Sequence, residues 1–203
     1  MNKLSGSLKK TSDLTGKYVH QSRKAGYKIF NIYFEDESRF GLFTRNGRAL
    51  TARGVKPICP YHHKFENTYL FGAFSPVNGN SLMIELPYCN RDMFQIFLDE
   101  LSKLNKHEYK IMFLDNGAFH KAKRLIVPEN IGLIFLPPYS PELNPAEKVW
   151  WIIKRHMSNK AYSSMKHLQD DLDMIISQHL TLNRIKSLTA YKLYLDAYRT
   201  NLY

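Results

Sequence analysis

The sequence is poor in cysteine and in long apolar runs, and each shortage excludes a class of protein. Two cysteines in 203 residues cannot build a disulfide framework, so a reducing compartment such as the cytoplasm is expected. No apolar run approaches the roughly 18 residues of a membrane span, and the first ten residues lack the apolar stretch of a signal peptide. With 44% hydrophobic and 13% aromatic residues, the chain is too apolar to be a disordered tail. We therefore expect a folded protein with no membrane partner.

Acidic residues are also scarce, and the excess of positive charge is concentrated near the N-terminus. The chain has 18 Asp and Glu against 29 Lys and Arg, a net charge of +11, and residues 1–28 hold seven of the bases and one acid. A basic arm ahead of a folded body is a common footprint of nucleic-acid binding, although a solvated leader has the same composition. We assign residues 1–26 to a basic linker or leader and residues 27–203 to one domain.

Short apolar and aromatic runs predict strands that alternate with helices. The expected strands cover residues 27–34, 68–75, 82–86, 109–115 and 131–136. The expected helices follow an N-cap at Asn90, cover residues 118–126, and run from Asn144 to about Met157, with amphipathic stretches around residues 165–176 and 191–198. Two Asn-Gly pairs, at residues 46–47 and 78–79, are typical of tight turns. This order predicts an α/β fold: a mixed sheet, helices on its faces and further helices at the C-terminus.

Two of the few acids lie where predicted strands end. Alternation along the first strand places Asp36 on the face of Phe34, whereas Glu35 and Glu37 point to the other face. Asp115 ends the fourth strand, and if the two strands are parallel neighbours their tips lie about 5 Å apart. Two carboxylates at this distance repel each other unless a cation or a proton lies between them. Oxygen ligands favour Mg²⁺ or Mn²⁺ over zinc.

A third acid, Glu147, follows a proline-rich connector. Residues 136–145, LPPYSPELNP, contain four prolines in ten residues and form a rigid segment. Asn144 and Pro145 fit the N-cap and the first position of a helix, and Glu147 then completes a capping-box pattern. A rigid connector also determines the position and direction of the first turn of the helix that follows it. Glu147 is therefore either a helix cap or a third ligand beside the other two acids.

Four segments together resemble the catalytic domain of DDE transposases, in the bacterial insertion-sequence branch of the mariner superfamily. They are FEDESRF (34–40), LFGAFSPVNG (70–79), FLDNGAFH (113–120) and LPPYSPELNPAEKVWWIIKR (136–155). The resemblance implies an RNase H-like fold, with helices on both faces of the mixed sheet. It also implies that Asp36, Asp115 and Glu147 are the catalytic and metal-binding triad. Ala146 departs from the family pattern, and the 31 residues between Asp115 and Glu147 are somewhat fewer than usual.

The same resemblance implies the activity and its partners. Two Mg²⁺ or Mn²⁺ ions, roughly 3.5–4 Å apart, would support cleavage of transposon ends and strand transfer into target DNA, typically at a TA step. Double-stranded DNA is the expected partner, and a homodimer is the expected active form. Residues ahead of Tyr27 leave no room for the helix-turn-helix modules of the family, so we expect a DNA-binding segment that is separately encoded or lost.

Basic residues near the predicted site are candidates for phosphate contacts. They are Arg45, Arg48, Arg53, Lys56, Lys148, Lys154 and Arg155. Asn116 and His120 are candidate accessory residues, although His120 would equally suit a half-buried helix position, and at least one of Trp150 and Trp151 should lie in the core. Two other functions stay open. One is a different RNase H-like nuclease, and the other is a degenerate or domesticated copy that only binds DNA or a partner.

Overall fold

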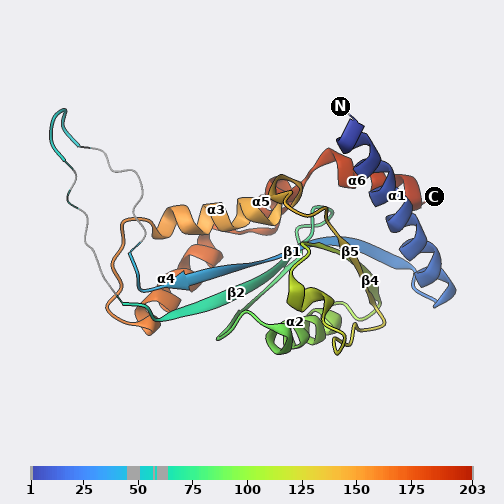
Figure 1. The fold of residues 1–203 in the computed structure, drawn as a ribbon, viewed down its shortest axis with the longest axis horizontal. Helices are drawn as coiled ribbons and strands as arrows, with labels where there is room; N and C mark the ends of the chain where they lie inside the picture. The colour runs from blue at the N-terminus through green and yellow to red at the C-terminus, as the bar shows by residue number, and fades with distance from the viewer. Residues whose placement is uncertain (1, 45–50, 57, 59–63, 203) are drawn as a thin grey trace.

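The computed structural model describes residues 2–44, 51–56, 58 and 64–202, with the backbone alone for residues 2–11 (Figure 1). The strands are β1 (Ile29–Gly41), β2 (Asn67–Phe74), β3 (Ser81–Leu86), β4 (Glu108–Leu114) and β5 (Ile131–Phe135). The helices are α1 (Asn2–Lys24), α2 (Arg91–Lys103), α3 (Ala146–Met157), α4 (Met165–His179), α5 (Leu182–Thr189) and α6 (Lys192–Leu202). Two 3₁₀ helices, η1 (Ala118–Lys121) and η2 (Pro141–Leu143), lie between them. Among the described helices, none combines the length and the apolar character needed to cross a membrane.

The five strands form one mixed sheet in the order β3-β2-β1-β4-β5. β1, β4 and β5 are parallel to one another, while β2 and β3 run antiparallel beside β1. β2 and β3 follow one another through a short turn and pair antiparallel, whereas β4, which follows α2, pairs parallel with β1. The predicted mixed sheet is confirmed, and β1 lies at its centre.

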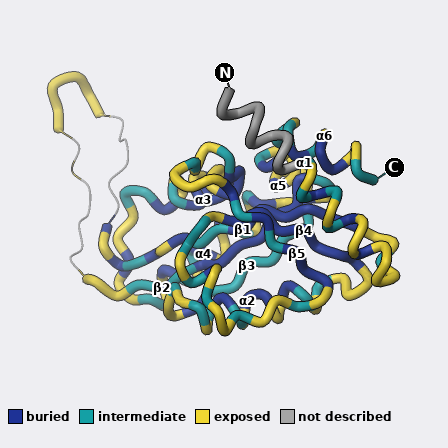
Figure 2. Tube along the Cα trace, turned by 45° about the vertical axis from the view of Figure 1, so that its right-hand side comes forward, coloured by how far each residue is buried: buried dark blue, intermediate teal, exposed yellow. Residues whose placement is uncertain are grey.

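Helices cover both faces of this sheet, so the apolar core has two layers (Figure 1). On one face Phe34, Trp150 and Tyr194 belong to a large buried cluster built from β1, α3 and α6. On the other face Phe71 and Phe94 belong to a smaller cluster under α2. Figure 2 shows that the central strands are buried along most of their length, whereas the outer helices and loops expose one side. Sheet strands with apolar residues on both faces have this pattern.

β1 is longer than the sequence predicts, so the acids at positions 35–37 lie within the strand and not after it. The strand was expected to end at residue 34, yet it continues to Gly41. β4 pairs with β1 only from Ile29 to Phe34, whereas β2 pairs with it from Phe34 to Gly41. The antiparallel neighbour satisfies the backbone of β1 after the parallel neighbour has ended. The three consecutive acids Glu35, Asp36 and Glu37 therefore lie inside β1, just beyond the point where its pairing with β4 ends.

The N-terminal residues form a helix that the sequence analysis did not predict. α1 contacts α6, and Val19 is buried in the larger core cluster with 2% of its surface exposed. The hydroxyl of Tyr18 donates a 3.0 Å hydrogen bond to the carbonyl of Leu133 on β5. Residues 1–26, expected as a linker or leader, thus include a helix attached to the sheet. The proposed boundary after residue 26 stays a prediction.

Other elements match the sequence analysis unevenly. The N-cap at Asn90 is confirmed, because its side chain accepts a 3.1 Å hydrogen bond from the amide of Met93. The turn at residues 78–79 is confirmed by the positive φ of Gly79, 82°. The helix predicted over residues 118–126 is wrong beyond η1, because the Gln95 side chain bonds both backbone groups of Ile126 and holds that segment along α2. α5 was not predicted, and the expected turn at residues 46–47 lies outside the described residues.

Candidate active site

The three predicted acids line one cavity of about 430 Å³. Phe34 pairs with Phe113 across the parallel β1–β4 ladder, so Asp36 and Asp115 each stand two residues beyond the same pair. The expectation that their strands are parallel neighbours is confirmed. Glu147 reaches the same cavity from the first turn of α3. The fold thus brings Asp36 into one cavity with Glu147, which lies more than 100 positions later in the chain.

The proline connector forms a wall of this cavity and orients the start of α3. Its prolines 137, 138 and 141 line the cavity. The Asn144 side chain donates a 2.8 Å hydrogen bond to the carbonyl of Glu35, which joins the connector to β1 one residue before Asp36. The amide of Asn144 donates to the carbonyl of Pro141 at 2.9 Å, so it is not available for a capping box with Glu147. The capping box is therefore not formed, and the role of Glu147 as a metal ligand stays a prediction.

Asp36 is held by a tryptophan on α3. The indole Nε1 of Trp150 donates to Oδ2 of Asp36 at 3.0 Å. Trp150 is 1% exposed and Trp151 is 58% exposed, which confirms that one of the pair lies in the core. Gly72 pairs with Asp36 on β2, and a Cβ at Gly72 would lie 2.7 Å from Cη2 of Trp150. The absence of a side chain at Gly72 allows the indole to approach the sheet.

Negative charge accumulates around Asp36. Burial, followed by the charges of Glu37 and Glu147, raises the pKa of this carboxyl to about 8. A carboxyl in these surroundings is ionised at neutral pH only when positive charge is close by. Three carboxylates at the rim of one cavity are a hard-oxygen donor set, which suits Mg²⁺ or Mn²⁺. The donor set fits the predicted cofactor.

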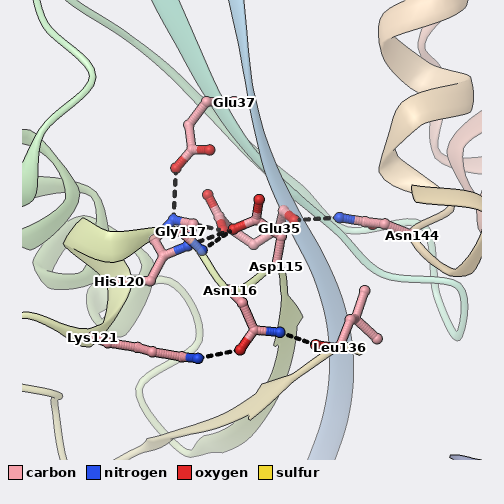
Figure 3. Close-up of polar contacts among 9 residues, drawn as sticks. All are labelled: Glu35, Glu37, Asp115, Asn116, Gly117, His120, Lys121, Leu136 and Asn144. Carbon is pink, nitrogen blue, oxygen red and sulfur yellow. Dashed lines mark hydrogen bonds and ion pairs between the residues drawn. The ribbon is translucent and has the colours of Figure 1, made fainter. Parts of the chain in front are cut away.

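Asp115 has one oxygen held by two donors (Figure 3). Its Oδ1 accepts from the amide of Gly117 at 2.7 Å and lies 2.9 Å from Nδ1 of His120. The bond with His120 holds the pKa of Asp115 below its usual range. Asp115 therefore stays ionised, and its second oxygen takes part in neither of these bonds.

His120 links Asp115 to a second acid. Its side chain is 1% exposed, and Nε2 lies 2.9 Å from Oε1 of Glu37. Burial opposes protonation, but the hydrogen bonds with Asp115 and Glu37 outweigh it and raise the pKa of His120 to about 9. The rings of Phe94 and Phe119 have centroids 4.4 and 4.2 Å from the imidazole. His120 thus lies in the 3₁₀ turn η1 and is more deeply buried than the half-buried helix position that was considered, and its accessory role stays a prediction.

Asn116, the other predicted accessory residue, lines the cavity and connects its walls. Its side-chain amide donates to the carbonyl of Leu136, at the start of the connector, and its oxygen accepts from Nζ of Lys121 (Figure 3). These bonds join the end of β4 to the proline connector. Asn116 therefore supports the position of the elements that carry Asp115 and Glu147.

Three residues at this site were not predicted from the sequence: Glu35, Glu37 and Tyr139. Glu35 and Glu37 lie on the opposite face of β1 from Asp36 and meet His120 there. The run of three acids at positions 35–37 was the available signal, since alternation already separated their faces. Tyr139 lines the cavity and is fully exposed in the connector, with a left-handed φ of 56°. A tyrosine between prolines gave no comparable signal.

The predicted DNA contacts fall in three places. Lys148 follows Glu147 on α3, and its Nζ lies 4.3 Å from the centroid of the Tyr191 ring. Lys154 lines a second cavity of about 390 Å³, whose other basic residues are Arg39, Lys64 and Lys160. Arg155 lies over Trp151, with 5.2 Å from Cζ to the ring centroid.

Of the remaining candidates, Arg53 and Lys56 are exposed in the segment after β1. Arg45 and Arg48 lie outside the described residues. The full set of DNA contacts stays a prediction.

Comparison with known proteins assigns the chain to a family. The family model for DDE superfamily endonucleases matches residues 31–169, about two thirds of the chain. The Tc3 transposase of Caenorhabditis elegans is 26% identical over 170 residues, which are 77% of this chain and 51% of the transposase. An uncharacterised protein of Sinorhizobium fredii, y4pE/y4sA, is 38% identical over 96 residues, 46% of this chain and 71% of that protein.

Solved structures of Mos1 transposase show the same fold. The Mos1 mariner paired-end complex with Mn has a TM-score of 0.62 at 13% identity, and the match covers 100% of this chain and 64% of that one. A pre-cleavage Mos1 transpososome also has a TM-score of 0.62, at 11% identity and with 97% and 63% covered. The predicted RNase H-like fold is confirmed, and the chain spans about half to two thirds of these transposases. The chain belongs to the DDE superfamily endonucleases.

Proposed function

We propose that this chain is the catalytic part of a DNA transposase that cleaves transposon ends and transfers them to target DNA with Mg²⁺ or Mn²⁺. One observation carries the proposal: Asp36, Asp115 and Glu147 reach the same cavity from β1, from the end of β4 and from α3. When bound, a pair of divalent ions would activate water or a 3′-hydroxyl and stabilise the leaving oxygen of the scissile phosphate. The protein supplies position and charge instead of a covalent nucleophile.

Each acid has its own support. Trp150 orients Asp36, and Gly117 with His120 orients Asp115. Glu147 depends on the connector, which Asn144 joins to the backbone of β1. Ligands held in this way lose little conformational freedom when they bind an ion. The arrangement is suited to phosphodiester cleavage.

The proposed assembly with DNA is based on the complexes that the Mos1 transposase forms. Mos1 forms a paired-end complex, and a Mos1 strand transfer complex is also known. By analogy, we propose a homodimer that holds two transposon ends on double-stranded DNA and inserts at a TA step, in the cytoplasm and nucleoid of a bacterial cell. A helix-turn-helix segment would supply sequence recognition. Lys148, Lys154 and Arg155 would contact phosphates along α3.

Strand transfer tests this proposal most directly. A pre-cleaved transposon end with a free 3′-hydroxyl is incubated with the chain, a TA-containing plasmid and Mg²⁺. Joined product is expected from the native chain. Asp115→Asn and Glu147→Gln should each lower the rate at least about 100-fold, because loss of metal-ion stabilisation costs several kcal/mol. Glu129→Gln, which changes an exposed carboxylate, is the matched control.

A metal titration separates this function from the two alternatives. Calorimetry with Mn²⁺ should show uptake that Asp115→Asn weakens. No uptake would favour the inactive, DNA-binding copy. Metal-dependent cleavage without any joining to a TA target would favour another RNase H-like nuclease. Either outcome contradicts the transposase proposal.

A further inference from the structure

A second group of ligand-type side chains lies behind the catalytic cavity, on the α2 side of β1. Glu35, Glu37 and His120 each place one ligand atom within 4.8 Å of the other two. The side chains of Glu35 and His120 are buried, with 0% and 1% exposed, and that of Glu37 is mostly buried, with 11% exposed. Asp36, Asp115 and Glu147 are not members of this cluster, which we call the rear cluster.

The hydrogen-bond donors in the rear cluster are too few for its carboxylates. The imidazole has two ring nitrogens: Nδ1 bonds Asp115, and Nε2 bonds Glu37 at 2.9 Å. Glu35 lies farther away, with Oε2 3.6 Å from Nε2, and neither of its oxygens has a hydrogen-bond partner. A buried carboxylate left without a partner is costly, because its lost hydration is not replaced. Its position beside two further acids adds repulsion.

A cation among these three side chains would satisfy Glu35 and Glu37 together. Four ligands held tetrahedrally at about 2.0–2.1 Å from an ion are roughly 3.3 Å apart. The observed separations from Nε2 to the two carboxylates, 2.9 and 3.6 Å, lie on either side of that value. An ion there would take the place of the proton on Nε2, which leaves as a hydrogen ion.

The other side of the imidazole has the arrangement found around metal-bound histidines. Such a histidine usually donates its remaining N–H to a carboxylate, a backbone carbonyl or a water, which determines the tautomer and the ring orientation. Here that carboxylate is Asp115, 2.9 Å from Nδ1. The rings of Phe94 and Phe119 contact the imidazole at tilted angles of 56° and 58° and restrict its rotation further.

We propose that Glu35, Glu37 and His120 bind one divalent cation, separate from the ions of the catalytic cavity. One imidazole and two carboxylates suit Mn²⁺ or Zn²⁺ better than Mg²⁺, which prefers oxygen ligands. The bound ion would position Asp115 through His120 and offset the acidic charge behind the catalytic site. This proposal concerns metal binding by itself and does not depend on transposase activity.

The test removes the catalytic ligands first. In a chain with Asp36→Asn, Asp115→Asn and Glu147→Gln, the catalytic cavity has no carboxylate ligand left, while the residue-115 amide oxygen still accepts from His120. We expect calorimetry and elemental analysis to show one tightly bound Mn²⁺ or Zn²⁺ per chain. Adding Glu37→Gln or, separately, His120→Ala should weaken binding at least tenfold. Adding Glu129→Gln should leave it unchanged.

Two outcomes would overturn the proposal. One is that the chain with all three triad substitutions binds neither Mn²⁺ nor Zn²⁺ although circular dichroism shows that it is folded. Protons, and not a cation, would then neutralise the carboxylates of the rear cluster. The other is binding that neither Glu37→Gln nor His120→Ala affects. Glu37→Gln keeps the shape of the side chain, so it tests the ligand role even if His120→Ala does not fold. Because DNA cleavage is not measured, failure here leaves the transposase proposal untouched.

Discussion

Trp150 donates a 3.0 Å hydrogen bond from its indole nitrogen to Oδ2 of Asp36, across 114 positions of the chain. Trp150 lies three residues after Glu147 on α3, so this bond joins the helix of one acid to the strand of another. The indole is also packed against Phe74, with ring centroids 5.3 Å apart. Core packing and the orientation of a proposed metal ligand therefore depend on the same side chain.

Trp150→Phe should separate these two roles. Phenylalanine keeps an aromatic ring in the core but has no N–H, so Asp36 loses its donor. We expect stability to fall by about 1–3 kcal/mol and Mn²⁺ affinity of the catalytic site to fall roughly tenfold. Denaturant unfolding and calorimetry measure the two effects. Trp151→Phe changes an exposed neighbour and should alter neither quantity; equal effects from both substitutions would contradict this role of Trp150.

Gly72→Ala should disturb the packing of Trp150 against β2. A Cβ there would lie 2.5 Å from Cζ of Phe74 and 2.7 Å from Cη2 of Trp150. Overpacking of this kind typically costs 1–3 kcal/mol, and we expect a loss of about that size in urea unfolding. In a Trp150→Phe background the cost should be smaller, because the shorter ring leaves more room. Additive costs would show that Gly72 and Trp150 are not coupled.

Lys148→Ala should weaken DNA binding without sequence preference. Lys148 is exposed beside Glu147, where it could contact a phosphate near the cavity. Loss of one phosphate contact should make the slope of log K against log salt less steep by about 0.9. Fluorescence anisotropy at several salt concentrations measures this slope. Lys103→Ala, at the end of α2 on the opposite face, is the control, and an equal effect there would indicate general charge attraction alone.

Asp171→Asn should lower stability at neutral pH but not in acid. Burial raises the pKa of Asp171, yet hydrogen bonds from Tyr162 at 2.5 Å and Lys160 at 2.9 Å outweigh it and hold the pKa below its usual range. A lowered pKa stabilises the fold above the unfolded value of about 3.9, and this stabilisation is lost as pH falls through the folded pKa. The expected loss at pH 7 is about 1 kcal/mol, and it should shrink below about pH 4.

The neighbouring residue provides a control for that prediction. Asp170 pairs with Lys166 at 2.6 Å, but the two side chains are 57% and 78% exposed. Solvent screens such a pair, so Asp170→Asn should leave the unfolding midpoint unchanged. If Asp171→Asn lowers stability by the same amount at every pH, then packing, and not charge, explains the effect of the substitution.

Much of the candidate site was predictable because it depends on local patterns. Alternation along β1 and β4 places Asp36 and Asp115 on one face, and parallel pairing brings their positions together. The prolines before α3 restrict the backbone enough to indicate where Glu147 points. The exact end of β1 was not predictable, because β2 extends the strand after β4 stops.

Patterns of single segments failed where distant residues decide the structure. α1 contains few apolar residues, so its helix was not expected; it is packed through scattered positions such as Val19, Tyr18 and the contact with α6. The segment after η1 has helical composition, but Gln95 on α2 takes the backbone groups that a helix would use. In both cases long-range contacts outweigh local propensity.

By itself, the sequence determined the mixed α/β fold and the placement of Asp36 and Asp115 at neighbouring strand ends, since both follow from periodicity and turn residues. The resemblance to DDE transposases added Glu147 as the third acid. Only the tertiary structure decided which groups surround those acids. Glu37 and His120 are 83 positions apart, and Trp150 and Asp36 are 114 apart. Hydrogen bonds of about 3 Å need side chains placed to within a fraction of an ångström. That placement comes from the packing of both faces of the sheet, and no local pattern specifies it.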